Sequence, residues 1–330
     1  MRRGLYIAIG IFMSVCYASP LWADQIRIVT PFAKTFLNSS SANVAISVEK
    51  NAFDYIKIYV NGREVAKLSE LKDRTCLCYT VGLRPGLNRI RISAYKGERA
   101  LEDNEVAVFV KSVLSKISAA PQGFQKYVFH GSQGEKNCLP CHRIEPEPGD
   151  LGPSSPEKSS CYSCHKDMTK VKYVHGPASV WACASCHNIN NDTQKNGVPW
   201  PDGLSCEPCH GDSLDKWKEL KFAHGPTAVG HCSACHNPHG SENPGFLRLQ
   251  ATDLCLSCHE DKASGDHVVT GFGSGGHPVR NRTDPRNPQK ELSCASCHNP
   301  HASATRDLLL YESGEDEDPM PGFCKECHRF

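Results

Sequence analysis

The stretches CSACHNPH at residues 232–239 and CASCHNPH at residues 294–301 are two copies of the pattern that decides the architecture of this 330-residue chain. Each copy starts with two cysteines that are separated by two residues and followed at once by a histidine. Six further Cys-x-x-Cys-His motifs occur, so that the chain has eight, none of them degenerate. Their cysteines are Cys138 and Cys141, Cys161 and Cys164, Cys183 and Cys186, Cys206 and Cys209, Cys232 and Cys235, Cys255 and Cys258, Cys294 and Cys297, and Cys324 and Cys327.

This spacing meets the demands of covalent haem attachment. Two thiols add to the two vinyl groups of one haem, and the next residue reaches the iron. A zinc site of four cysteines has compatible pairs, and an exported protein can hold a disulfide framework, but neither explains a histidine after every pair. We therefore predict eight c-type haems. Their proximal iron ligands are His142, His165, His187, His210, His236, His259, His298 and His328.

An internal repeat groups the motifs in pairs. First cysteines lie 23 residues apart in the first three pairs and 30 apart in the last, which indicates four units of two haems at about residues 130–165, 175–210, 224–259 and 277–328. A histidine precedes each unit. His130, His175 and His224 lie eight residues before their cysteine, whereas His277 lies 17 before Cys294.

Residues 122–330 resemble the doubled Cys-x-x-Cys-His family of multihaem cytochromes, found in bacteria that respire with metals or other external acceptors. The two copies quoted above match the family's repeat most closely. The first two units differ, because residues 143–145 and 188–190 follow their first motifs without a histidine. The resemblance implies respiratory electron transport.

Ligand counting extends the prediction to the second axial position of each iron. All sixteen histidines lie at or after His130, and half of them are motif histidines. One spare histidine per haem remains, so every iron can be bis-histidine. Met168 and Met320 are alternative ligands, but neither occupies a repeated position. The distal candidates are His130, His175, His224, His277, His239 and His301, followed by His231 and His267.

The first 23 residues have the features of a secretory signal peptide. Arg2 and Arg3 form a basic start, an apolar run follows, and Ala23 ends a stretch suited to cleavage. The alternative is an uncleaved membrane anchor, which the short apolar run and Pro20 disfavour. We expect export, a periplasmic or extracellular location and no transmembrane span after cleavage.

Residues 24–120 have the pattern of β-strands, with turn signals such as Asn61-Gly62 between alternating runs. The segment resembles bacterial immunoglobulin-like domains, above all from Gly86 to Tyr95, which implies an all-β sandwich. It has no histidine, and we expect a docking or spacing module. The predicted strands include Ile26–Val29, Val44–Val48, Tyr55–Val60, Arg89–Ile92 and Val106–Val110.

Two thiols of this β-rich segment lie outside the motifs. Cys76 and Cys78 are one residue apart, so a strand places them on the same face. A strained disulfide and two buried apolar thiols both fit this spacing, and we expect burial.

A linker of small and turn-forming residues at 118–123 leads into a region of different composition. Residues 121–330 have few long apolar runs and are rich in Gly, Pro, Asn and Ser. The haems must therefore supply most of the core. We expect a loop-rich, haem-packed multihaem cytochrome c domain with short helices around the motifs, which collapses without its cofactor.

The net charge of the protein indicates which kinds of partner it favours. Loss of Arg2 and Arg3 changes the net charge from +1 to −1, and eight oxidised haems with ionised propionates lower it to about −9. Such a surface favours basic or cationic partners and disfavours nucleic acid. The acidic run at residues 312–318 is interpreted as a solvated loop.

The function that these features favour is electron transfer between redox partners, with no enzymatic activity. The donor and acceptor are redox proteins or an extracellular or metal acceptor. One alternative is a reductase of small oxyanions, which needs an iron with an open position. Assembly into an oligomer or a conductive filament uses the same residues and is a further alternative.

Overall fold

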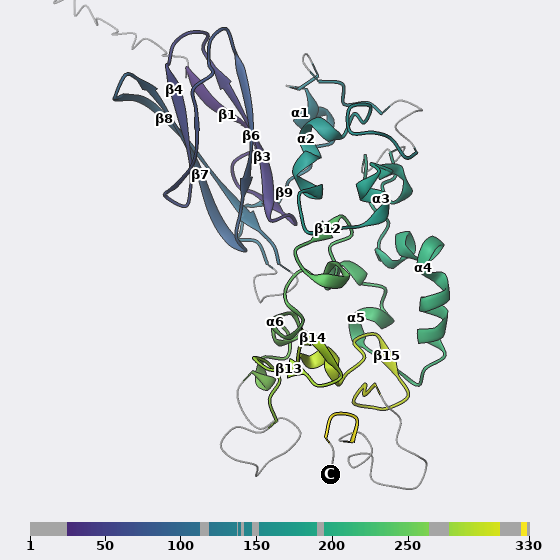
Figure 1. The fold of residues 1–330 in the computed structure, drawn as a ribbon. Coiled ribbons are helices and arrows are strands. Elements are labelled where there is room, and N and C mark those ends of the chain that lie inside the picture. Colours follow the sequence, from purple (N-terminus) through teal and green to yellow (C-terminus); the bar gives the residue numbers. More distant parts are fainter. Residues whose placement is uncertain are drawn as a thin grey trace, which may run out of the picture.

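The computed structural model describes residues 25–112, 119–136, 138–139, 142–146, 152–189, 195–263, 277–310 and 325–328. An N-terminal β-rich region is followed there by a loop-rich region with short helices, as Figure 1 shows. Within these ranges, no helix has the length and apolar character that a membrane span needs. The sequence-based predictions that lie outside the described residues concern the signal peptide at residues 1–23, Cys141, Cys324, His267, Met320 and the acidic run at residues 312–318.

The β-rich region consists of two sheets. The smaller has the strand order β1-β3-β6, and the larger has the order β5-β4-β7-β8-β2-β9. All five predicted runs lie within strands. Neighbouring strands are antiparallel, except that β2 pairs in parallel with β8 and with β9. The strands are β1 Ile26–Thr30, β2 Thr35–Leu37, β3 Ser41–Val48, β4 Tyr55–Val60, β5 Arg63–Leu68, β6 Cys76–Gly82, β7 Gly86–Lys96, β8 Arg99–Val110 and β9 Gln125–Lys126.

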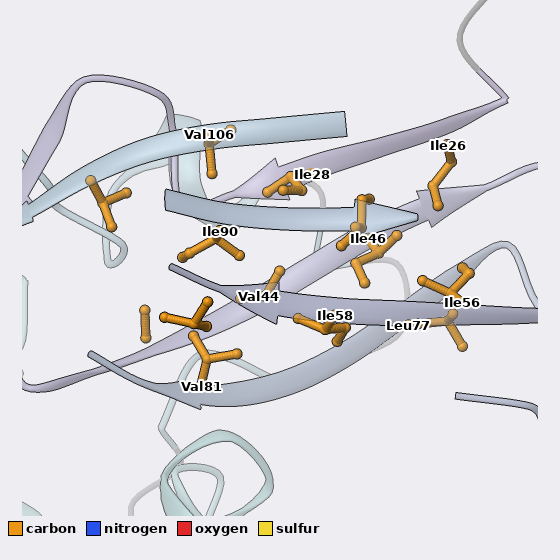
Figure 2. Close-up of a cluster of buried hydrophobic side chains, with 14 of the residues drawn as sticks. Ile26, Ile28, Val44, Ile46, Ile56, Ile58, Leu77, Val81, Ile90 and Val106 are labelled. Carbon is orange, nitrogen blue, oxygen red and sulfur yellow. The ribbon is translucent and has the colours of Figure 1, made fainter. Parts of the chain in front are cut away.

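A single apolar core holds the two sheets together (Figure 2). Alternation along β4 directs Ile56 and Ile58 inward, and both are fully buried, as are Ile46, Ile90 and Ile92 from neighbouring strands. Burial of each such side chain contributes about 1.5–3 kcal/mol to stability.

The turn between β4 and β5 has the geometry that its sequence predicts. Asn61 and Gly62 have φ values of 53° and 83°, the left-handed pair that a tight hairpin between β4 and β5 requires.

The expected burial of Cys76 and Cys78 is wrong, because both residues are exposed. Leu77 between them is buried in the core. Since side chains alternate across a strand, the inward position of Leu77 forces both cysteines onto the outer face of β6. Neither thiol is in a disulfide.

Packing of the β-rich region extends beyond the predicted boundary at Ala120. Strand β9 pairs with β2, and the Tyr127 N–H donates to the Phe36 carbonyl at 2.8 Å. The Tyr127 ring packs against the core, and burial raises the pKa of its hydroxyl to about 12. Phe124 meets Phe109 edge to face at 6.3 Å between centroids. The segment from Phe124 to Tyr127 therefore belongs structurally to the β-rich region.

The loop-rich region contains short helices and two-stranded pairs. Its helices are α1 Ser132–Glu135, α2 Tyr162–His165, α3 Gly176–Ser179, α4 Gly203–Lys218, α5 Gly225–Ala228 and α6 Ala251–Leu256, with 3-10 turns η2 Lys166–Thr169, η3 Cys183–Ser185, η4 Cys232–Ala234, η5 Pro244–Phe246, η6 Glu260–Lys262 and η7 Cys294–Ser296. Its pairs are β10 Tyr173–Val174 with β12 Gly240–Ser241, β11 Phe222–Ala223 with β15 Ala302–Ser303, and β13 Thr283–Asp284 with β14 Asn287–Glu291.

Buried apolar side chains are scarce in this second region. Among its described residues they are Trp181, Ala182, Leu254, Leu292 and Ala302. Five such residues do not form one protein core of the kind that Figure 2 shows for the β-rich region. The polypeptide of this region therefore depends on something other than its own apolar side chains for stability.

Candidate haem sites

The motifs from the second to the seventh, which the structure describes in full, each fold as a tight turn, and the fourth lies within α4. The backbone N–H of the motif histidine donates to the carbonyl of the first cysteine, for example His187 to Cys183 at 2.9 Å and His236 to Cys232 at 3.1 Å. Residues three and four positions apart lie on the same face of such a turn. The two thiols and the imidazole of a motif are thus directed to one side, as attachment to one haem requires.

Six motif histidines each lie opposite a second histidine. The ring centroids of every pair are between 6.0 and 6.2 Å apart. The two rings are within 26° of parallel, except that those of His277 and His328 are at 87°. The pairs are His165 with His130, His210 with His175, His187 with His239, His259 with His224, His236 with His301 and His328 with His277.

This separation fits a shared metal ion. Two metal–imidazole bonds of about 2 Å on opposite sides of one iron, together with the two ring radii, separate the centroids by about 6 Å. Direct ring stacking brings centroids closer, as Trp217 and His301 show at 3.9 Å. The residues present therefore fit a haem iron between each pair.

Hydrogen bonds at Nδ1 set the imidazole tautomer. His175 and His224 lie 2.9 and 3.0 Å from the carbonyls of Pro238 and Pro300. His187 is likewise 2.8 Å from the Asn196 carbonyl. A carbonyl oxygen only accepts, so Nδ1 carries the proton and Nε2 keeps its lone pair for a metal.

Burial keeps three of these imidazoles neutral. It lowers the pKa of His165, His239 and His301 to about 4, with nearby histidines adding to the effect. A neutral imidazole is the form that binds iron. At pH 7 these side chains are thus ready to bind without losing a proton.

Backbone pairing between units places a histidine of one unit against the first motif of the preceding unit. Strand β12, which follows His239, pairs with β10, and the His175 N–H donates to the His239 carbonyl at 3.1 Å. The same arrangement joins β15 to β11, with His224 donating to the His301 carbonyl at 2.9 Å. The first motif of one unit therefore receives its facing histidine from the following unit.

The Asn-Pro-His sequence has a local role that the motif pattern did not reveal. The Asn237 side chain accepts the His239 N–H at 3.2 Å, and Asn299 accepts that of His301 at 3.1 Å. This turn directs the intervening proline carbonyl to the leading histidine of the preceding unit. The repetition of the three residues was the signal that could have indicated this role.

One of the two remaining distal candidates, His231, lies elsewhere in the structure. His231 packs against Trp200, with centroids 4.4 Å apart, and faces no motif histidine within the described ranges. His267 is outside those ranges. Nor does the ring of His142 face a second histidine in the part of the chain that the structure describes.

Thiols of consecutive motifs lie beside each other from the third motif to the eighth. The Cys206 and Cys232 thiols of the fourth and fifth motifs lie close enough to interact, as do those of Cys255 and Cys294 of the sixth and seventh. The motifs thus follow one another in space in sequence order. The other neighbouring pairs, each close enough to interact electrostatically, are Cys186 with Cys209, Cys235 with Cys258 and Cys297 with Cys327.

The zinc alternative has no support from the geometry. Among the described residues, no three His, Cys, Asp or Glu side chains converge as a metal-ion site requires. Structural zinc is held by four such ligands at short range. The histidine pairs instead match an ion that takes its other ligands from a macrocycle.

A buried carboxylate distinguishes one pair. Glu135 is 6% exposed and lies 3.1 Å from Nδ1 of His130, where the other leading histidines meet backbone carbonyls. The Lys195 ammonium lies 3.0 Å from the same carboxylate and 2.5 Å from the carboxylate of Glu145. Glu135 was not among the residues predicted from the sequence, although its position five residues after His130 and three before Cys138 was a usable signal.

Replacement of Glu135 by glutamine is expected to raise the reduction potential of one haem. A carboxylate acceptor makes the imidazole a stronger donor and stabilises the oxidised iron, and a hydrogen bond to a charged group contributes about 1.5–3 kcal/mol. At about 59 mV per tenfold change for one electron, this range corresponds to a rise of about 65–130 mV. Spectroelectrochemical titration would measure it. Glu145→Gln is the control, and an unchanged set of potentials in Glu135→Gln would contradict the role.

The comparisons with known proteins bear on the two regions differently. The family model for the doubled CXXCH motif matches residues 224–264 and 287–330, which cover most of the last two units. This match supports a multihaem c-type cytochrome. It also supports covalent haem binding and electron transfer. No curated protein matches the chain.

Solved structures show only weak likeness. Fibronectin(III)-like modules of Clostridium thermocellum CbhA are 18% identical, with 26% of this chain and 95% of that chain covered and a TM-score of 0.22. An FMN-binding beta-glucuronidase from Facaelibacterium prausnitzii L2-6 is 15% identical, with 27% and 11% covered and a TM-score of 0.20. TM-scores this low do not establish a fold.

Proposed function

We propose that this protein is a periplasmic or extracellular electron carrier that binds eight covalent c-type haems, most of them with two histidine ligands. The observation that carries the proposal is the set of six histidine pairs at iron-bridging separation. When bound, haem supplies one-electron redox chemistry at an iron whose ligands set its potential. The immunoglobulin-like β-rich region then serves as a docking or spacing module.

The residues of the chain have separate tasks in this proposal. The motif thiols would hold each macrocycle, and the paired histidines would bind its iron through Nε2. Hydrogen bonds such as that from His187 to the Asn196 carbonyl fix the ring orientation. Because both histidines of each pair would bind the iron, a small substrate would have no place to bind it at these six sites, which favours transfer of electrons over catalysis.

The adjacency of consecutive motifs supports a relay. Neighbouring thiols such as Cys206 and Cys232 place the attachment points of two motifs beside each other. Electrons can then move along the chain in sequence order, between a donor at one end and an acceptor at the other.

The purified protein is expected to contain eight covalent haems per chain. Eight intact motifs require this number, and thioether bonds survive acid-acetone extraction. A pyridine haemochrome assay against protein concentration, together with the intact mass, gives the count. Cys206→Ser with Cys209→Ser should lower the count by one. Haem that leaves with the solvent, or a count well below eight, would contradict the proposal.

A second candidate function, reaction of a small ligand at one open iron, is favoured by an observation at the first motif. His142 faces no second histidine within the described ranges, and the sequence has Asn190 where the third and fourth units have His239 and His301. The first haem is therefore the place to look for an exchangeable axial position.

We expect one haem in eight to bind cyanide or carbon monoxide if this second function holds. Asn190→His should abolish the binding, since it restores the repeated ligand, whereas the neighbouring Asn191→His should leave it intact. Optical titration and electron paramagnetic resonance would report the high-spin fraction. Absence of ligand binding in the unaltered protein leaves electron transfer as the only function.

A further inference from the structure

The two cysteines outside the motifs of the described chain form a pair on one surface. Cys76 and Cys78 occupy the outer face of β6, where β3 offers Ser47 and Ala45 as their partners in register. Both residues are exposed and neither is in a disulfide. Their thiols hydrogen-bond to each other. Two accessible thiols in contact are the reactive arrangement for thiol–disulfide chemistry.

The pair is chemically activated. The hydrogen bond from Cys78 lowers the pKa of Cys76 to about 6, while the same contact raises that of Cys78. At neutral pH one sulfur is therefore a thiolate and the other a thiol. The thiolate is the form that reacts.

The same face of the sheet contacts the first haem unit. Nδ2 of Asn43 donates to the Cys164 carbonyl at 3.0 Å, and Oγ1 of Thr80 donates to Asn43 at 2.6 Å. Thr80 lies two residues from Cys78 and is close enough to Asp167 to lower the pKa of its carboxyl. Figure 1 shows β3 and β6 beside α1 and α2.

The haem-attaching cysteines nearest to the pair come from two motifs. Cys138 of the first motif and Cys164 of the second both lie close enough to Cys78 to act on it electrostatically. The thiol pair is thus next to the attachment points of both haems of the first unit.

We propose that Cys76 and Cys78 form a two-electron thiol–disulfide site that exchanges electrons with the haems of the first unit. This inference rests on the proposed haem binding. On oxidation of the thiolate–thiol pair, one S–S bond forms and the one S–H proton, on Cys78, is released to water. The two electrons leave singly, one to each of two ferric irons, which become ferrous. The reverse reaction reopens the S–S bond.

Strand geometry makes this disulfide labile. Residues two positions apart on a strand are separated by about 6.6–6.8 Å, the upper end of the Cα separation that a disulfide spans, about 4.4–6.8 Å. A bond formed there is strained, and strained disulfides are easily reduced. Reversible cycling is the expected behaviour of this pair, and permanent cross-linking is not.

Anaerobic reductive titration of the haem-loaded full chain tests the inference. The unaltered protein should accept two electrons more than Cys76→Ser with Cys78→Ser. Either single replacement should remove the same two electrons, because one remaining thiol cannot form the internal bond. Equal electron counts in proteins that each contain eight haems would overturn the dithiol site and leave haem binding intact. A protein without covalent haem would instead overturn the proposed function.

Thiol alkylation with peptide mapping gives an independent readout. Both cysteines should be alkylated after electrode reduction and protected after oxidation by a protein acceptor too large to reach them. Haem-free chain treated with the same acceptor should stay fully alkylated, since the route through the haems is missing. Alkylation that does not change with potential, whether complete or absent, would overturn the inference.

Discussion

Replacement of His239 by alanine is expected to convert one haem from low-spin to high-spin and to create one binding site for carbon monoxide. His239 faces His187 at 6.0 Å with an interplanar angle of 3°, and burial lowers its pKa to about 4. Removal of this imidazole leaves one iron with a single protein ligand. A change of axial ligand shifts a haem potential by of the order of 100 mV or more.

Electron paramagnetic resonance and carbon monoxide titration would quantify the change. We expect His239→Ala to bind one more carbon monoxide per chain than the unaltered protein, and added imidazole should restore the low-spin spectrum. His231→Ala is the matched control, since His231 packs on Trp200 and should alter neither readout. If His231→Ala opened an iron and His239→Ala did not, the pairing proposed for the third motif would be wrong.

Production of the chain without haem attachment is expected to unfold the loop-rich region and leave the β-rich region folded. The described residues of the loop-rich region bury few apolar side chains, among them Trp181 and Leu254. The β-rich region has a continuous core from Ile26 to Val110. A domain with such a core has a free energy of unfolding of about 5–15 kcal/mol, whereas short haem-free loops have little to oppose their chain entropy.

Hydrogen exchange with mass spectrometry would map the difference along the chain. Amides of β4, β7 and β8 should stay protected in the haem-free protein, and those of α4 and α6 should exchange within seconds. Ile58→Ala serves as the control, because loss of a buried isoleucine costs about 2–5 kcal/mol and should weaken only the β-rich region. Protected amides in α4 without haem would contradict the expectation.

Some features followed from local sequence because local physics decides them. Alternation along residues 55–60 predicted β4, and the Asn61-Gly62 pair predicted the turn after it. The Cys-x-x-Cys-His spacing fixes one turn of backbone, so it also indicated which thiols and which imidazole act together. Such predictions need no knowledge of distant residues.

The ends of the β-rich region show where local pattern was insufficient. Composition placed a linker at residues 118–123, but β9 pairs with β2 and Tyr127 packs on the core. A strand of only two residues, such as β9, is too short to show an alternating pattern in the sequence. Cys76 and Cys78 were correctly placed on one face, yet the choice of face depended on Leu77 reaching the core, which is a property of two packed sheets.

By itself the sequence determined that eight Cys-x-x-Cys-His motifs exist, that they come in four units, and that the other histidines match them in number. Only the tertiary structure decided the partners: His130 passes over the nearby first motif to face His165, and His239 reaches back to His187 of the preceding unit. The reason is that a motif turn is held by hydrogen bonds within five residues, whereas each distal imidazole is positioned by contacts such as β10 with β12, between residues more than sixty positions apart.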